Sequence, residues 1–334
     1  MAKAAVVAGR RGRLLPILGI YEAFNTLILP ETNLAAYLGD TWFFVHSLVT
    51  STREGGRHQP LVALAAIKQI PGVVIYDVAF PKDVNRVVMH EIKWRLRHPT
   101  ERRMVFLRTT NVKDLANALP QEKMYELMKG LEPGKDRAAK QSQMSDDKVD
   151  ELVSERLFEG GYALIDYRQR LGDEQYARLL REGRIRYVLA TGNILDQAVG
   201  AHDLLRRQGI YANVINVTSP SLLEKNPAHL EIIAPKNERH VPSVIMTDTG
   251  KGMITDIKGE FPGILVRAPD DYVTSLGRLE FFKRFGLDAE SIAQLLLRDA
   301  RIPSGGSVRK AEVQPVTLAN NLDEVARMLA GYDR

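Results

Sequence analysis

Two histidines, a carboxylate and a pair of glycines lie within one polar stretch between His46 and Pro60. The stretch follows the apolar run 41–45, which is typical of a buried strand, and we expect a helix to begin after it. A neutral imidazole both accepts and donates protons near pH 7, so His46 and His58 suit proton transfer at substrate hydroxyl or carbonyl groups. Glu54 could orient one of these rings. The alternative is that both histidines cap the ends of the strand and the helix.

Arg108 adds a cation to this group. It follows the apolar run 104–107, which predicts another buried strand, and a guanidinium can hold a phosphate or carboxylate through two parallel hydrogen bonds. The carboxyl ends of parallel strands meet at one edge of a sheet, where ligands of α/β proteins usually bind. We therefore expect Arg108 to lie near the histidines, and this grouping favours an active site over structural caps.

Other candidates carry weaker signals. Gly192 follows the predicted strand 185–190 and could bind phosphate at a helix start, but a tight turn explains it equally well because no glycine-rich phosphate motif is present. His202, His229 and His240 lack metal-ligand spacing. The charged, glycine-rich stretch 248–252 is predicted to be a plain loop. A serine hydrolase has little support, because no G-x-S-x-G motif occurs.

Residues 1–112 alternate between strand and helix patterns, which predicts a mostly parallel sheet with helices on both faces. Strands are expected at 14–20, 41–45, 73–77 and 104–107, and helices at 21–38, 61–69 and 81–97. Tyr21 and Phe24 would share one face of the first of these helices. That spacing alone favours core packing over a platform on which a flat ligand stacks.

A second α/β block occupies residues 160–334, so the predicted fold class is α/β with two mostly parallel-sheet domains. Its expected strands are 162–166, 185–190, 211–217, 243–246 and 263–266, and its expected helices are 194–207, 289–297 and 322–330. Charged residues, Gln, Ser and Met dominate the intervening residues 113–159. We interpret these residues as a linker with one helix at 147–156; a partner-docking surface is the open alternative.

The composition is that of a globular protein: 334 residues, 45% hydrophobic and 26% charged, with a net charge of +5. Cysteine is absent, which excludes disulfides and thiolate metal sites. No apolar stretch is long enough to cross a bilayer and no signal peptide is evident, so we expect a cytoplasmic protein without a membrane partner. The basic clusters 10–13 and 93–98 lack a nucleic-acid motif, and we interpret them as solvated surface rather than a nucleic-acid interface.

The stretch 46–60 resembles the pyrimidine-binding domain of transketolase, in which T-H-D-S is followed by E-D-G-P-T-H-Q-P. The two histidines have the same separation, His58-Gln59-Pro60 is identical, and Glu54 falls on the aspartate of that motif. Arg108 falls on the arginine of the family's S-R-Q strand end. Further segments that resemble segments of this family are 70–72, 81–85, 188–193, 216–221 and 283–290.

This resemblance implies thiamine diphosphate chemistry, in which a carbon–carbon bond next to a carbonyl is broken and ketol groups pass between sugar phosphates. Phe24 would stack on the pyrimidine ring with Tyr21 nearby, which revises the core-packing interpretation of Phe24. His46 and His58 would handle substrate hydroxyl protons, and Glu54 would orient the substrate or the loop. Gln59 and Arg108 would bind substrate, with Arg108 at its anionic end. Such sites form between subunits, so the second domain is expected to serve dimerisation.

The chain also departs from the family pattern. The glutamate that activates the pyrimidine would lie ahead of residue 1, and the diphosphate-binding G-D-G…N motif is absent. Ser47 and Gly56 replace the family's aspartate and proline. We therefore expect thiamine diphosphate to be shared with a partner subunit, which would bind the Mg²⁺ in place of this chain. Segments 240–243 and 270–271 look closer to the homodimeric pyruvate dehydrogenase component. A subunit of a split transketolase, part of a 2-oxo acid dehydrogenase, and a truncated non-catalytic homologue remain open.

Overall fold

The computed structural model describes residues 17–21, 27–38, 43–47, 61–98, 101, 103–109, 119–130, 144–273 and 276–299. For residues 17–18, 20–21, 38 and 43–47 it describes the backbone alone. The chain divides into a unit Met1–Pro303 and a unit Ser304–Arg334, and all described residues belong to the first unit.

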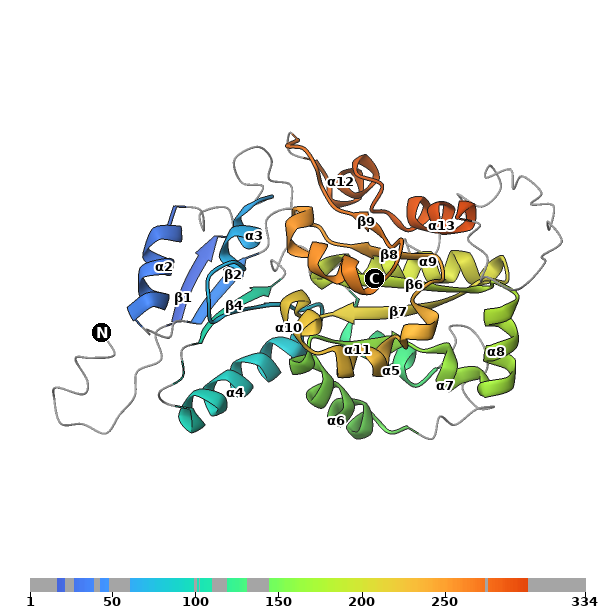
Figure 1. Cartoon of the computed structure of the whole chain (residues 1–334), viewed down its shortest axis with the longest axis horizontal. Coiled ribbons are helices and arrows are strands. Elements are labelled where there is room, and N and C mark those ends of the chain that lie inside the picture. Colours follow the sequence, from blue (N-terminus) through green and yellow to red (C-terminus); the bar gives the residue numbers. More distant parts are fainter. Residues whose placement is uncertain are drawn as a thin grey trace. The chain divides into compact units, whose positions relative to one another are not determined.

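The first sheet consists of four parallel strands in the order β1-β2-β4-β3 (Figure 1). The strands are β1 (Ile17–Tyr21), β2 (Phe43–Ser47), β3 (Val73–Asp77) and β4 (Met104–Thr109), and the helices are α2 (Leu29–Leu38), α3 (Ala63–Ile67) and α4 (Pro81–Arg97). All five residues of β3 are buried, as are the first five of β4, because a parallel sheet is covered on both faces. Pro81 occupies the first turn of α4, where its missing N–H costs no hydrogen bond.

The second sheet has five strands in the order β5-β7-β6-β8-β9, and β5 alone runs antiparallel to its neighbour. Its strands are β5 (Gly161–Ile165), β6 (Ile185–Thr191), β7 (Tyr211–Val217), β8 (Ser243–Met246) and β9 (Leu265–Arg267). The α-helices around it are α7 (Tyr167–Leu171), α8 (Asp173–Arg181), α9 (Leu195–Arg207), α10 (Pro220–Lys225), α11 (Pro227–Ile233), α12 (Arg278–Arg284) and α13 (Ala289–Arg298). Short 3₁₀ turns are η4 (Leu157–Glu159), η5 (Gly192–Ile194), η6 (Lys236–Glu238), η7 (Lys251–Met253) and η8 (Thr255–Glu260).

Two helices within residues 113–159 contribute to the hydrophobic core. These are α5 (Gln121–Met128) and α6 (Asp146–Arg156), and both pack against β5. Met124 of α5 and Val149 and Val153 of α6 are completely buried. The helix predicted at 147–156 is thus confirmed, whereas the division into two domains and a linker stays a prediction.

The α/β fold class with parallel-rich sheets is confirmed, but some predicted elements are wrong in detail. Tyr21 is the last residue of β1 and α2 begins only at Leu29, so Tyr21 and Phe24 do not share a helix face. Pairing of Tyr21 with Ser47 of β2 extends the strand at the expense of the helix. The predicted helix 322–330 lies outside the described residues. None of the described helices has the length and apolar composition needed to cross a membrane.

Candidate functional site

The carboxyl ends of the first sheet bring several predicted site residues to one edge. In the strand register, Ile20 of β1 is opposite His46 of β2, His46 is opposite Arg108 of β4, and Arg108 is opposite Asp77 of β3. The expectation that Arg108 and the start of the histidine stretch lie close together is therefore confirmed at the level of the backbone.

Four of the seven predicted site residues, Phe24, Glu54, His58 and Gln59, lie outside the described residues. Tyr21 and His46 are placed by their backbones, at the ends of β1 and β2. In the sequence, Phe24 follows closely after Tyr21, and Glu54 and His58 follow after Ser47, the register partner of Tyr21. The two segments with these residues thus follow adjacent strand ends.

Arg108 is the one predicted site residue whose side chain the structure describes, and it is buried. Its Nη1 donates hydrogen bonds to Asp77 Oδ2 at 3.0 Å and to Asp248 Oδ1 at 2.7 Å. Only 1% of the Arg108 side chain is exposed, and the two carboxylates are equally buried. The guanidinium therefore joins the end of β3 to the segment that follows β8.

The sequence interpretation missed both carboxylates of this ion-pair cluster. Asp77 and Asp248 each end or closely follow an apolar strand, which is the same signal that singled out Arg108. The prediction of a plain loop at 248–252 overlooked the burial of Asp248. Burial raises the pKa of Asp77, although Arg108 opposes the rise, and the Asp248 carboxylate adds to it. With one cation between two carboxylates, a proton on Asp77 would balance the charge of the cluster.

Gly192 supplies the turn that lies against this cluster. Its φ is +50°, and a Cβ at this position would lie 2.0 Å from Asp77 Oδ1, so only glycine fits. The Thr191 hydroxyl beside it donates to Thr247 Oγ1 at 2.9 Å. The turn between β6 and α9 therefore contacts a carboxylate of the protein, which favours the tight-turn interpretation of Gly192 over a phosphate site.

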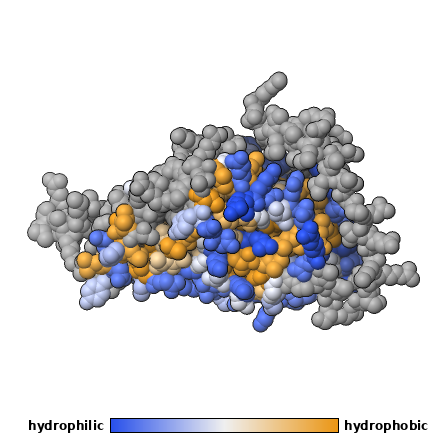
Figure 2. Space-filling model, turned by 90° about the horizontal axis from the view of Figure 1, so that it is seen from above, coloured by the Kyte–Doolittle hydropathy of each residue, from blue (hydrophilic) through white to orange (hydrophobic). Residues whose placement is uncertain are grey.

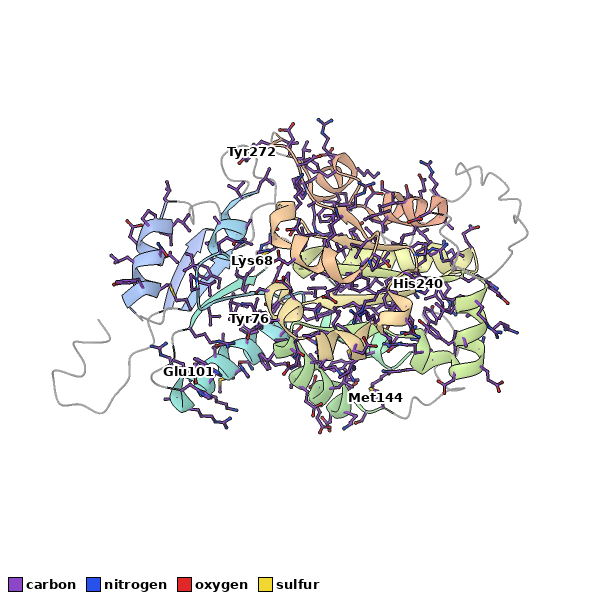
Figure 3. All side chains as sticks on the ribbon, in the orientation of Figure 1. Lys68, Tyr76, Glu101, Met144, His240 and Tyr272 are labelled. Carbon is purple, nitrogen blue, oxygen red and sulfur yellow. The ribbon has the colours of Figure 1, made fainter. Side chains whose placement is uncertain are left out.

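Further bonds join the surroundings of the first sheet to loops of the second. The Asp77 N–H donates to the Thr218 carbonyl at 2.8 Å. Lys68, at the end of α3 (Figure 3), donates to the Gly252 carbonyl at 2.7 Å and forms an ion pair with Asp256. A Cβ on Gly250 would lie 1.6 Å from the Leu61 carbonyl oxygen. Loops of the second sheet thus contact the part of the first sheet at which the candidate site lies.

Two of the remaining histidines have structural partners. His202 Nε2 lies 2.8 Å from the Tyr167 hydroxyl, and His202 Nδ1 lies 2.9 Å from Asp203 Oδ1. His229 Nε2 lies 2.7 Å from the Gly161 carbonyl oxygen. Burial lowers the pKa of both rings. Among the residues that the structure describes, no cluster of three or more His, Cys, Asp or Glu could hold a metal ion.

Comparisons with known proteins identify this fold. No family model and no curated protein matches the sequence. Among solved structures, transketolase from Leishmania mexicana matches 88% of this chain and 36% of its own, with a TM-score of 0.58 and 16% identity. Transketolase from Pichia stipitis in complex with sedoheptulose-7-phosphate matches 84% of this chain and 33% of its own, with a TM-score of 0.57 and 18% identity.

A split-gene transketolase, described as an inactive β4 tetramer, matches 89% of this chain and 78% of its own, with a TM-score of 0.55 and 13% identity. The chain thus spans about a third of the full-length transketolases but most of the split-gene chain. The chain has the fold of part of a transketolase.

Proposed function

We propose that the chain is one part of a thiamine diphosphate-dependent enzyme of transketolase type, which transfers ketol groups between sugar phosphates. The similarity to a split-gene transketolase over most of both chains carries this proposal. The G-D-G…N motif is absent from these 334 residues, so the diphosphate and Mg²⁺ would be bound from outside them. The cytoplasmic location stays a prediction.

The backbone geometry supports a cofactor held at the carboxyl edge of the first sheet. The segment with Phe24 and the segment with Glu54 and His58 begin at register neighbours, Tyr21 and Ser47. In this proposal, residues from both segments would contact one ligand at this edge. When bound, thiamine diphosphate supplies the carbon nucleophile that attacks the substrate carbonyl.

The residues of this chain would bind and orient the reactants and move protons. Phe24, with Tyr21 beside it, would position the pyrimidine ring. His46 and His58 would exchange protons with substrate hydroxyls, oriented by Glu54.

Gln59 and Arg108 would bind the substrate. Arg108 Nη1 already donates to both carboxylates, so a substrate anion would compete with Asp77 and Asp248 for this guanidinium.

An exposed apolar surface on and beside α2 supports the need for a partner subunit. Leu27, Leu34 and Tyr37 are 72%, 57% and 75% exposed. Figure 2 shows hydrophobic surface on this side of the chain. Leu34 and Tyr37 share one face of α2 at i and i+3, and exposed apolar side chains gathered on one face favour a protein–protein interface. We propose that this surface contacts another subunit, either a second copy or the chain that binds the diphosphate.

The decisive experiment mixes the purified chain with a polypeptide that carries the G-D-G…N motif, in the presence of thiamine diphosphate and Mg²⁺. We expect the mixture to convert xylulose 5-phosphate and ribose 5-phosphate, whereas each chain alone is inactive. Turnover of pyruvate with an artificial electron acceptor instead would favour the 2-oxo acid dehydrogenase alternative. Absence of thiamine diphosphate binding and of any thermal stabilisation, alone or in the mixture, would leave the non-catalytic alternative.

Two substitutions assign the histidines. His46→Ala and His58→Ala should each lower kcat at least about a hundredfold, since general acid–base catalysis contributes factors of this size. The exposed His240 provides a matched control, and His240→Ala should leave kcat unchanged. Equal losses in all three variants would show that the effect is not specific to the proposed site.

A further inference from the structure

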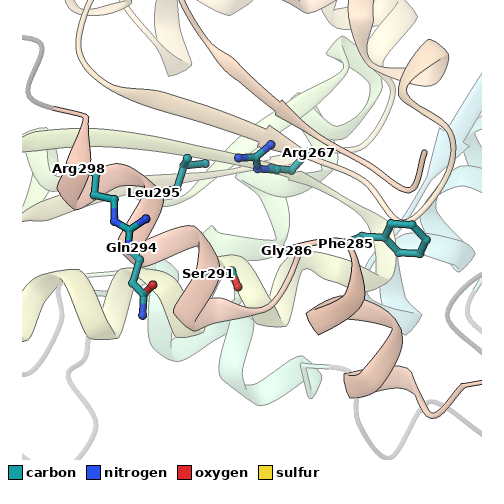
Figure 4. A pocket seen from close by; sticks show the side chains of 7 residues that line it. All are labelled: Arg267, Phe285, Gly286, Ser291, Gln294, Leu295 and Arg298. Atoms are coloured by element: carbon teal, nitrogen blue, oxygen red, sulfur yellow. The ribbon is translucent and has the colours of Figure 1, made fainter. Parts of the chain in front are cut away.

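A pocket of about 370 Å³ lies between the edge strand β9 and helix α13 (Figure 4). Four of its lining residues, Ser291, Gln294, Leu295 and Arg298, recur at helical spacing and so share one face of α13. The remaining three are Arg267, the last residue of β9, and Phe285 and Gly286, which follow α12. None of them belongs to the candidate site on the first sheet.

The charges at this pocket are positive. Arg267 and Arg298 reach it from two different elements, and no acidic residue lines it. Over the described part of the chain, neither guanidinium has a carboxylate at ion-pair distance, whereas the half-buried Arg103 and the buried Arg108 and Arg278 all do. A pocket lined by two guanidinium groups and by no carboxylate attracts anions.

The uncharged lining also favours an anion. Leu295 and Phe285 form apolar walls beside the guanidinium groups, against which the uncharged part of a ligand can pack. The Gln294 amide can donate further hydrogen bonds. The Ser291 hydroxyl donates to Asp288 Oδ2 at 2.6 Å, so both this serine and the carboxylate at the start of α13 are already engaged.

We infer that this pocket binds a small phosphorylated metabolite, with its phosphate held by Arg267 and Arg298 and its remaining part packed on Phe285. A planar guanidinium matches phosphate oxygens with two parallel hydrogen bonds. The volume exceeds that of a lone phosphate ion and falls in the range of small-molecule sites. The inference is independent of the proposed enzymatic function, because it uses only residues of the second sheet's surroundings.

The test uses the full-length chain and isothermal titration with sodium pyrophosphate, ADP and citrate at matched ionic strength. Saturable binding of pyrophosphate or ADP at physiological salt is expected. Arg267→Gln and Arg298→Gln should each weaken it about tenfold or more, as loss of a charge-assisted hydrogen bond does. The control Arg284→Gln, on the exposed last turn of α12 and outside the pocket, should stay within about twofold of the parent chain.

Several results would overturn the inference. These are absence of saturable phosphate binding, binding of citrate in preference to both phosphate compounds, and an equal loss in Arg284→Gln. Phe285→Leu tests the apolar wall, because it should weaken ADP more than pyrophosphate; equal weakening would contradict the packing on Phe285. Urea unfolding of each variant separates loss of the site from loss of the fold. Arg267→Lys keeps the charge without the fork and should bind with intermediate affinity.

Discussion

Arg108 joins the two sheets through its side chain. Its Nη1 bonds to Asp77 and Asp248, which lie 31 and 140 positions away in the sequence. A buried arginine between two carboxylates is costly to remove, because the carboxylates are then left without compensation. The same ion pairs that fix the strand end also restrict the guanidinium, so stability and substrate binding compete for one side chain.

Replacing Arg108 should therefore unfold the chain more readily. Arg108→Met is expected to lower the free energy of unfolding by about 3–5 kcal/mol, and adding Asp248→Asn should restore part of the loss, because it removes the excess negative charge. Urea unfolding of the single and double variants measures both effects. The control Arg178→Met removes a 63% exposed arginine and should change stability by less than about 0.5 kcal/mol. A double variant that is no more stable than the single one would contradict this account of the cluster.

Asp83 should make stability depend on pH in an unusual direction. Burial raises its pKa to about 6, although hydrogen bonds from Arg86 at 2.7 Å and Tyr162 at 3.0 Å oppose the rise. The folded state then binds more protons than the unfolded state between the two pKa values. The contribution of Asp83 to the free energy of unfolding is therefore largest below about pH 4 and falls as the pH rises to about 6.

Asp83→Asn removes this contribution. We expect the difference in unfolding free energy, parent minus variant, to fall by roughly 2 kcal/mol between pH 4 and pH 7, from the size of the pKa shift. Denaturant titrations at several pH values measure it. Asp150→Asn is the control: although burial acts to raise the pKa of Asp150, hydrogen bonds from Tyr125 and Lys82 outweigh it and lower that pKa. The contribution of Asp150 to the free energy of unfolding therefore changes below pH 4. If the difference between the parent and Asp83→Asn does not change with pH, the raised pKa of Asp83 is refuted.

Helices α5 and α6 show how a polar segment can still enter the core. α6 is rich in charged residues, yet Val149 and Val153 lie one turn apart on the same face and are completely buried. Ser145 begins the helix by accepting a hydrogen bond from the Lys148 N–H at 3.2 Å. The composition of this segment is typical of a linker because it contains few apolar residues. Those few apolar residues are nevertheless buried.

Val153→Ala tests whether this segment supports the fold. If α6 is part of the core, the substitution should cost about 2 kcal/mol, through lost burial and the cavity left behind. Ser154→Ala, at the exposed neighbouring position, should change stability by less than about 0.5 kcal/mol. A freely moving linker would give two indistinguishable variants when their thermal unfolding is compared.

How well the sequence predicts an element depends on where its determining contacts lie. The strands 73–77 and 211–217 and the helix 81–97 are predicted at their observed bounds, because runs rich in apolar residues and Pro81 are local signals. The helix α7 is not predicted, because its five residues are too few to show a helical pattern of apolar residues. Its start depends instead on the Asp166 side chain, which accepts a hydrogen bond from the Arg168 N–H. Asp77 and Asp248 were missed for the opposite reason: their pairing with Arg108 depends on strand order, which no local pattern encodes.

At the scale of the whole molecule, α2 presents apolar side chains both to the sheet and to solvent. Thr32 and Ala35 of α2 are buried, yet Leu34 and Tyr37 on its other side are 57% and 75% exposed. The helix α2 thus has apolar side chains on its solvent side as well as on the side that packs on the sheet. The apolar side chains on the solvent side favour contact with another chain. The split-gene transketolase that this chain resembles is itself described as a tetramer.

Association through α2 predicts a specific response to charge. We expect the parent chain to self-associate or to bind its partner, and Leu34→Glu with Tyr37→Glu to shift it toward monomer in sedimentation velocity, because desolvating two carboxylates opposes burial of that surface. Met89→Glu with Leu96→Glu is the matched control on α4, where the two residues are 45% and 62% exposed. Loss of association in the α4 variant, with retention in the α2 variant, would place the interface on α4 instead. The proposed cofactor site needs residues from outside this chain, so the α2 variant should lose activity in the reconstituted mixture together with association. Activity that returns at high protein concentration would show weakened assembly. Activity that stays lost would show a damaged site.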